Sequence, residues 1–322
     1  MLVNAPKYSD LAYWDNIVNQ YIQGKHPYIL IPNIERQIWD YFKYCLRSQN
    51  RYFFQHPLIP VIKASFEKNL YILKKDTELF RARNDNQHTI WKENWRYAEI
   101  MSEPKYLERL RNSGYDSTKL DEMCANYSSV LNEPETKRIK DKLDRGFQGY
   151  DADGCSAPPS ELASAGRCNS EGVAYLYAAQ EEHTAVAEIR PYVGDTISIA
   201  TLHPKRDLRL VNLDYDPSAT ISGAEFFYHE IQEEFARVNK GQKSDYLITQ
   251  YITSLVEHSG YSGLCFRSSL VEDGTNYVIF RPNDCEAVSS KICYLKGVQY
   301  QYFQHARGAW FLSAADCRAP GS

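Results

Sequence analysis

The stretch GRCNSEGVAYLYAAQEEHTAVAEIRP, residues 166–191, carries the pattern on which the fold prediction rests. Val173, Tyr175 and Tyr177 alternate with small or apolar residues, and this period of two predicts a strand. Acidic residues suited to a helix N-terminus follow, and the helix predicted after them ends at Pro191. The stretch therefore predicts a loop, a strand and a helix of about three turns in immediate succession.

The chain beyond this stretch predicts more strands than helices, in an irregular order. Two strands are predicted within 195–213, and two more, joined by a polar turn, within 261–282. Two helices lie between these pairs: the first opens with Ser222 and Glu225, spaced as in a capping box, and the second stops at Gly260. No glycine-rich dinucleotide loop follows a strand. The pattern predicts an α+β fold with a mixed, mostly antiparallel central sheet and flanking helices.

The N-terminal half divides by composition. Residues 1–75 alternate short helical patterns with prolines and aromatic residues, which predicts a helical N-terminal extension. Within 70–85, two runs of β-favouring residues flank a polar turn and predict a hairpin or a pair of strands. The main domain is predicted to span residues 76–310, with a polar insertion at 86–165 that ends in a Gly-, Pro- and Ser-rich surface loop. Residues 311–322 are predicted to form a tail.

Composition excludes several classes of protein. The chain of 322 residues has 37 Lys and Arg against 41 Asp and Glu, so no broad basic face for nucleic acid is expected. The start has no signal-peptide pattern, and no run of about 18 apolar residues occurs, so we expect a soluble, cytoplasmic protein that does not bind membranes. The eight cysteines show no Cys-x-x-Cys pair and no Cys/His zinc spacing. We therefore expect free thiols and no metal site.

Glu188 departs from the local rules. A carboxylate in the last turn of a helix lies at the negative end of the helix dipole, which costs about 0.3–1 kcal/mol. An exposed ion pair with Arg190 would compensate for this cost. Alternatively, Glu188, which lies near the small residues Ala185 and Ala187, could point at a ligand hydroxyl or at a developing positive charge. The pattern alone leaves both interpretations open.

Six blocks of the sequence, in the same order, resemble the RES domain family, which is named for an Arg, a Glu and a Ser. The resemblance covers about residues 76–300. The blocks are ELFRAR (78–83), GRCNSEGVAYLYAA (166–179), EEHTAVAEIRPYVGDTISIA (181–200), RDLRLVNL (206–213), GYSGLCFRSSL (260–270) and GTNYVIF (274–280).

The resemblance implies a toxin of the toxin–antitoxin type, with a core similar in fold to the diphtheria-toxin-like ADP-ribosyltransferases. Members cleave the bond between nicotinamide and ribose in NAD+ and pass the ADP-ribosyl group to water, phosphate or, in some cases, a protein. NAD+ is then a substrate, and no prosthetic group is expected. Family toxins are commonly silenced by a separately encoded antitoxin protein and commonly self-associate, so an antitoxin and a homo-oligomer are the partners that the resemblance implies.

Carried over position by position, the resemblance gives Glu188, Arg81 and Ser268 as the catalytic residues. The residues it implies for NAD+ binding are Arg81, Arg83, Arg167, Asn169, Tyr177, Ser268, Ser269 and Asn276. Arg83 is the nearest rival to Arg81, and Ser269 the nearest rival to Ser268. His183 is interpreted as a solvated helix residue, because the family motif does not require it.

The chemistry of NAD+ cleavage suits these residue types. Departure of nicotinamide leaves positive charge on the ribose, which the carboxylate of Glu188 would stabilise. The guanidinium groups of Arg81 and Arg167 would bind the pyrophosphate. Arginine-modifying transferases carry a second carboxylate two residues before this Glu, where the chain has Val186. We therefore favour hydrolysis or phosphorolysis of NAD+ over modification of a protein, and a catalytically silent binding module is the further alternative.

Overall fold

The computed structural model describes residues 8–25, 33–49, 54–84, 103–132, 149–214, 223–238 and 246–299. Its strands are β1 (Leu70–Leu73), β2 (Leu79–Asn84), β3 (Leu176–Ala179), β4 (Thr196–Pro204), β5 (Leu208–Leu213), β6 (Gly263–Arg267), β7 (Thr275–Ile279) and β8 (Cys285–Tyr294). The α-helices are α1 (Leu11–Ile22), α2 (Ile34–Ser48), α3 (Leu58–Lys68), α5 (Pro104–Asn112), α6 (Ser117–Asn132), α8 (Glu182–Glu188), α9 (Ala224–Ala236) and α10 (Leu247–His258). Among the residues described, the short 3₁₀ helices with defined bounds are η1 (Asp153–Cys155), η2 (Ser160–Leu162) and η4 (Pro282–Asp284).

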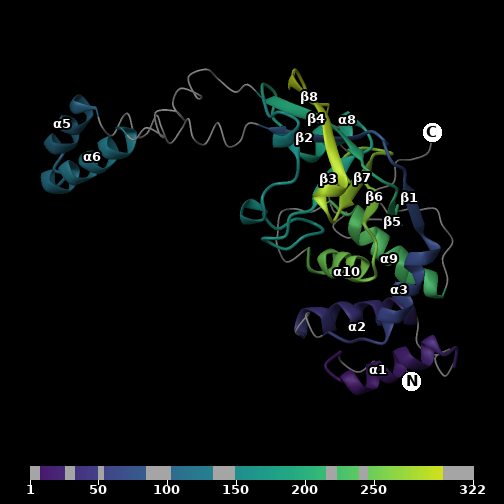
Figure 1. Cartoon of the computed structure of the whole chain (residues 1–322). Helices are drawn as coiled ribbons and strands as arrows, with labels where there is room; N and C mark the ends of the chain where they lie inside the picture. The colour runs from purple at the N-terminus through teal and green to yellow at the C-terminus, as the bar shows by residue number, and fades with distance from the viewer. Residues whose placement is uncertain are drawn as a thin grey trace.

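The eight strands form one sheet in the order β1-β5-β6-β7-β3-β2-β4-β8 (Figure 1). Within the described part of the chain, β5 and β6 are the parallel pair, and every other neighbouring pair is antiparallel. The predicted α+β fold with a mixed, mostly antiparallel sheet is therefore confirmed.

Helices stack in layers on one face of the sheet. Figure 1 shows α9 and α10 between the sheet and α2, with α1 beyond α2. Helix α2 repeats apolar residues at helical spacing, and Ile38, Phe42 and Cys45 are buried. They join one hydrophobic cluster with Phe235 of α9 and Ile252 of α10. The N-terminal helices and the sheet domain thus share a continuous core.

The hairpin predicted within residues 70–85 is wrong, because its two strands do not pair with each other. β1 pairs with β5 at one edge of the sheet, whereas β2 lies between β3 and β4. The turn after β1 bonds to the turn between β4 and β5: the Asp76 N–H donates to the Pro204 carbonyl (3.0 Å), and the Lys75 N–H donates to Asp207 (2.9 Å). These non-local bonds tie the turn between β1 and β2 to a distant part of the chain, and no local sequence pattern predicts them.

Three local predictions needed correction. The strand expected from residue 173 begins at Leu176. Helix α8 is shorter than three turns and ends at Glu188, because Arg190 adopts a left-handed conformation (φ 47°) directly before a proline. The capping box is also wrong: Gly223 (φ 61°) is the N-cap of α9, without a side-chain cap bond, and Ser222 lies outside the described residues.

The domain boundaries at residues 75, 86–165 and 310 stay predictions. Within the first range, β1 belongs to the sheet. Within the second, α5 and α6 lie apart from the sheet (Figure 1), whereas η1 packs on it, and residues 85–102 and 133–148 lie outside the described part. The tail at 311–322 also lies outside it.

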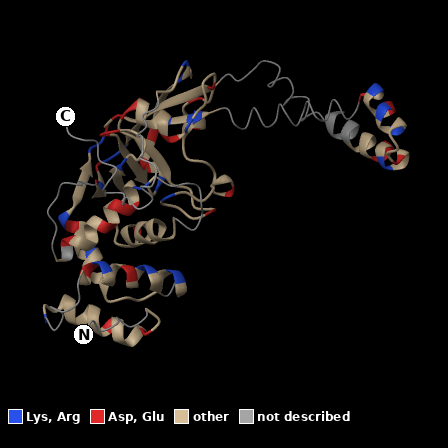
Figure 2. Cartoon of the chain, turned by 180° about the vertical axis from the view of Figure 1, so that it is seen from behind, with Lys and Arg blue, Asp and Glu red and all other residues tan. Residues whose placement is uncertain are grey.

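Charge and cysteine chemistry match the composition where the chain is described. Basic and acidic residues are interspersed along α2, α5 and α6 (Figure 2). The seven cysteines in the described ranges are free thiols. Among these ranges, none of the helices has both the length and the apolar character that a membrane crossing requires.

Candidate active site

Glu188 is held by two buried polar side chains. Its Oε1 accepts hydrogen bonds from Ser268 Oγ (2.7 Å) and Asn276 Nδ2 (2.6 Å). Such bonds to an ionised acceptor are short and strong, and they offset the unfavourable position at the end of α8. Within the described residues, no ion pair links Glu188 to Arg190, and Oε2 accepts no hydrogen bond. One carboxylate oxygen is therefore fixed, and the other is available to a ligand.

The two donors are fixed by the sheet and by the turn that follows β6. Asn276 lies on β7, between Ala179 of β3 and Phe266 of β6 in the sheet register. Ser268 Oγ accepts the backbone N–H groups of Leu270 (3.1 Å) and Val271 (3.3 Å). Because its lone pairs are occupied, the hydroxyl proton of Ser268 is directed to Glu188.

Small residues let α8 approach the sheet closely. Ala185 packs with Ala82 of β2 and Ala179 of β3 in one buried cluster. A Cβ at Gly274 would lie 2.8 Å from the hydroxyl oxygen of the buried Thr184. Larger side chains at these positions would push the helix, and with it Glu188, away from Ser268 and Asn276.

A cavity of about 350 Å³ opens beside Glu188. This volume lies within the range of small-molecule sites. Six of the predicted site residues line it: Arg81, Arg167, Tyr177, Glu188, Ser269 and Asn276. Ser268 reaches the site through Glu188, whereas Arg83 and Asn169 are not part of the cavity wall.

Arg81 occupies the place where two central strands separate. β2 and β3 pair only at Phe80 and Ala179. Beyond this pair, Arg81 Nη1 donates to the Tyr177 carbonyl (2.8 Å), and its buried Nε has no hydrogen-bond partner. Burial, with a smaller contribution from Arg83, lowers the pKa of Arg81 to about 10. The side chain stays cationic at neutral pH, so it supplies a desolvated positive charge to the cavity.

Arg83 contacts the segment that carries η1. Its Nη1 donates to the Gly154 carbonyl, and its guanidinium lies 4.2 Å from the centre of the Tyr150 ring. Both partners belong to the segment that carries η1. Arg83 therefore fixes that segment against β2 and is not part of the Glu188 cavity wall.

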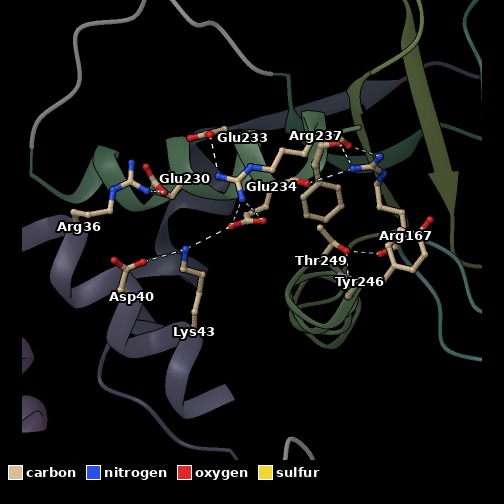
Figure 3. A network of polar contacts seen from close by, with 11 residues as sticks. Arg36, Asp40, Lys43, Arg167, Glu230, Glu233, Glu234, Arg237, Tyr246 and Thr249 are labelled. Atoms are coloured by element: carbon tan, nitrogen blue, oxygen red, sulfur yellow. Dashed lines mark hydrogen bonds and ion pairs between the residues drawn. The ribbon is translucent and has the colours of Figure 1, made fainter. Parts of the chain in front are cut away.

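Arg167 joins the cavity to the end of α9 (Figure 3). Its guanidinium donates to the carbonyls of Glu234 (3.3 Å), Phe235 (2.6 Å) and Arg237 (2.7 Å). These carbonyls have no partner within the helix and carry its negative dipole end, which a cation stabilises. Arg167 thus has a structural task as well as a place in the cavity wall.

Asn169 and Tyr177 organise the loop in front of β3. The Tyr177 hydroxyl donates to Asn169 Oδ1 (2.7 Å) and accepts the Cys168 N–H (3.0 Å), while Asn169 Nδ2 donates to three loop carbonyls. Burial raises the pKa of Tyr177, so the hydroxyl stays neutral. Gly166 is required here, because its Cβ would lie 2.6 Å from Asn169 Oδ1. The structure therefore uses Asn169 to hold the loop, and the Tyr177 ring to line the cavity.

Several lining residues were not found from the sequence. They are the apolar Phe80, Ile189 and Phe266, together with Arg190 and Tyr246. Phe80 directly precedes Arg81 on β2, and Phe266 lies two residues before Ser268, so both could have been inferred by proximity. Tyr246 is the N-cap of α10, and no local pattern links it to the site.

One group outside the cavity has the composition of a metal site. Ligand atoms of His229, Glu230 and Glu233 lie within 4.8 Å of one another. However, Glu230 pairs with Arg36 (2.6 Å) and Glu233 with Arg237 (3.0 Å), so both carboxylates already have cationic partners.

Comparison with family models agrees with the sequence resemblance. A structural comparison matches the M. tuberculosis MbcT–MbcA toxin–antitoxin complex at 8% identity, covering 74% of this chain and 94% of that one with a TM-score of 0.36. The curated proteins include no match. The model of the RES domain matches residues 137–301, which include Glu188, Ser268 and Asn276 but not Arg81. Because this match spans just over half of the chain, the protein belongs to the RES domain family.

Proposed function

We propose that the protein is a toxin that degrades NAD+ by cleaving its nicotinamide–ribose bond, with water or phosphate as the acceptor. The observation that carries the proposal is the carboxylate of Glu188 at the cavity wall. Ser268 and Asn276 hold Oε1, and Oε2 carries no bond within the described residues. A carboxylate oriented in this way is suited to a ribose hydroxyl or to the charge that develops on the ribose.

The reaction follows from the charges of the substrate. The bond between ribose C1′ and the positively charged nicotinamide nitrogen breaks, and its electron pair leaves with nicotinamide, which becomes neutral. Positive charge then remains on the ribose, in a state similar to that of glycoside cleavage. Glu188 stabilises this charge without reorientation, because its two donors already fix it. Water or phosphate then bonds to C1′, and water loses a proton as it does so.

Three cations of the cavity wall suit the pyrophosphate of NAD+. Arg81 and Arg167 are partly or largely engaged by backbone carbonyls, and Arg190 is exposed at the end of α8. Guanidinium groups bind phosphate oxygens through paired N–H donors, and a low-dielectric wall strengthens this attraction. Tyr177 and Phe266 offer aromatic faces for a planar ring.

Transfer to a protein acceptor is the same-site alternative. The position two residues before Glu188 is Val186, so the second carboxylate that would activate an arginine acceptor is missing there. This favours a small acceptor. We include in the proposal a separately encoded antitoxin that covers the site. A partner of this kind is named in the toxin–antitoxin complex from M. tuberculosis.

The test is product analysis with purified protein, with and without phosphate. Free ADP-ribose would indicate hydrolysis, a phosphorylated ADP-ribose phosphorolysis, and a labelled protein band transfer. Glu188→Gln keeps the shape of the side chain but removes its charge, so NAD+ consumption should fall by about 10²–10³-fold. Glu181→Gln, outside the Glu188 cavity, is the matched control. Absence of NAD+ loss with the wild type, or equal loss with Glu188→Gln, would refute the proposal.

A further inference from the structure

A second cavity, of about 240 Å³, adjoins the first. Arg167 and Tyr246 line both, so the two cavities share a wall. Three helices and the loop before β3 contribute charged and hydroxyl side chains to the second cavity. They include Lys43 and Arg47 of α2, Glu234 of α9 and its C-cap Arg237, Thr249 of α10, and Arg167 of the loop. A ligand longer than the first cavity can therefore continue into the second.

Helix α2 is built into this wall by specific contacts, which Figure 3 shows. Arg36 forms an ion pair with the buried Glu230 (2.6 Å), and Lys43 lies 3.8 Å from Glu234 and 3.1 Å from Asp40. The apolar face of α2 belongs to the main hydrophobic core. The RES family match begins at residue 137, so α2 lies outside it. The N-terminal helices therefore contribute residues that the family match does not include.

The side chains that line the second cavity carry a net positive charge. Four cationic side chains and one carboxylate line it. Arg237 pairs with Glu233 and Glu234, and Lys43 with Asp40 and Glu234.

Arg47 differs from these paired cations, since it is exposed in the last turn of α2 and forms no ion pair in the part of the chain that the structure describes. The first turn of α10, from Tyr246 to Thr249, adds the positive end of a helix dipole to the same wall. An anionic group is the ligand chemistry that this wall favours.

We propose that the second cavity binds a phosphate group, with Arg47 and Arg167 as its donors. The inference rests on the proposed function in one respect, since it takes the phosphate to be either the free phosphate acceptor or one of the two phosphates of the NAD+ pyrophosphate, which then spans the wall shared by the two cavities at Arg167. The N-terminal helices are then a component of the binding site as well as of the core. Lys43 supports the site by adding charge, while its pairs keep it in place.

The first experiment measures binding alone. The full chain is titrated calorimetrically with inorganic pyrophosphate, as wild type, Arg47→Glu and Lys63→Glu. Lys63 is an exposed cation of α3 that lines neither cavity, so its reversal makes the same charge change elsewhere. Arg47→Glu should raise the Kd for pyrophosphate on the order of tenfold or more at low salt, and Lys63→Glu should leave it unchanged. Thermal unfolding of both variants checks that they fold as the wild type does.

The second experiment distinguishes the two sources of the phosphate. A raised KM for NAD+ in Arg47→Glu, with kcat retained, would identify a phosphate of the substrate. A raised KM for phosphate, with hydrolysis unaffected, would identify the acceptor. The inference is overturned if the wild type does not bind pyrophosphate, or if Arg47→Glu binds it as tightly as the wild type. A wild type that binds pyrophosphate through Arg47 but does not consume NAD+ would instead refute the proposed function alone.

Discussion

Replacing Asn276 with aspartate changes one atom at the centre of the site. In Asn276→Asp, an oxygen takes the place of the Nδ2 donor, 2.6 Å from Glu188 Oε1. With the nearest oxygens in contact, the charge centres of the two carboxylates lie about 4 Å apart, where two like charges repel by about 4 kcal/mol at an effective dielectric constant of about 20. Because Glu188 is open to solvent on one side, we take about half of this, ~2 kcal/mol. The lost hydrogen bond to a charged acceptor costs about 2 kcal/mol more.

The two costs together correspond to about three pKa units, at 1.36 kcal/mol each. The carboxyl pair shares one proton, so its second apparent pKa should rise from about 4 in the unfolded chain to about 7 in the folded protein. A group whose pKa is raised on folding stabilises the protein below its unfolded pKa and loses this contribution as the pH rises through the folded value. Asn276→Asp should therefore be nearly as stable as the wild type at about pH 4.5 and about 4 kcal/mol less stable at about pH 8.

Urea unfolding at the two pH values, followed by circular dichroism, measures this difference. Asn276→Leu is the matched control, because it removes the donor without adding a charge, so its cost should vary with pH by about 2 kcal/mol, the lost bond alone, or about half as much as for Asn276→Asp. NAD+ consumption by Asn276→Asp, relative to the wild type, should also recover as the pH falls, since the protonated carboxyl pair restores a hydrogen bond to Glu188. Equal pH dependence of the aspartate and leucine variants would show that the bond between Asn276 and Glu188 is not what the structure indicates.

Two further predictions concern the loop before β3 and the N-terminal helices. Asn169→Ala removes the hydrogen bond from the Tyr177 hydroxyl and three bonds to loop carbonyls. The free energy of unfolding should therefore fall by about 2–4 kcal/mol. A loss under about 1 kcal/mol, measured by thermal unfolding, would contradict the role of Asn169 in holding the loop. Burial lowers the pKa of His56 to about 4, and its Nδ1 accepts the Leu58 N–H. Because the folded pKa is lowered, stability present above about pH 6.5 should decrease by about 3 kcal/mol as the pH falls to about 4. His56→Asn should flatten this decrease, and an unchanged slope in urea unfolding between these pH values would exclude His56 as its source.

The helices and the class of sheet could be predicted because their signals are local. Helix α2 repeats apolar residues every three or four positions, and this periodicity alone identifies the face that Ile38 and Phe42 bury. The end of α8 was located only approximately, since Pro191 sets an outer limit while the helix already ends at Glu188. Glu188 was singled out because it violates a local rule.

The partners of these residues could not be predicted, because they come from distant parts of the chain. No pattern around Glu188 indicates which groups bond to its Oε1, and Ser268 and Asn276 entered only through the family resemblance. Likewise, the task of Arg167 depends on where α9 ends, and the pairing of β1 depends on the turn that holds Asp207. Sequence patterns report each element, whereas the contacts between elements require the fold.

The separation between Glu188 and its two donors has a consequence for synthesis of the protein. Ser268 and Asn276 follow Glu188 by 80 and 88 residues, and Asn276 lies on a central strand. Chains grow at roughly 5–20 residues per second, so several seconds pass between the emergence of the carboxylate and that of its donors. A ribosome-bound chain that has exposed Glu188 still lacks the groups that orient it. The oriented carboxylate of Glu188 is therefore completed only after β7 has left the ribosome, late in the synthesis of the chain.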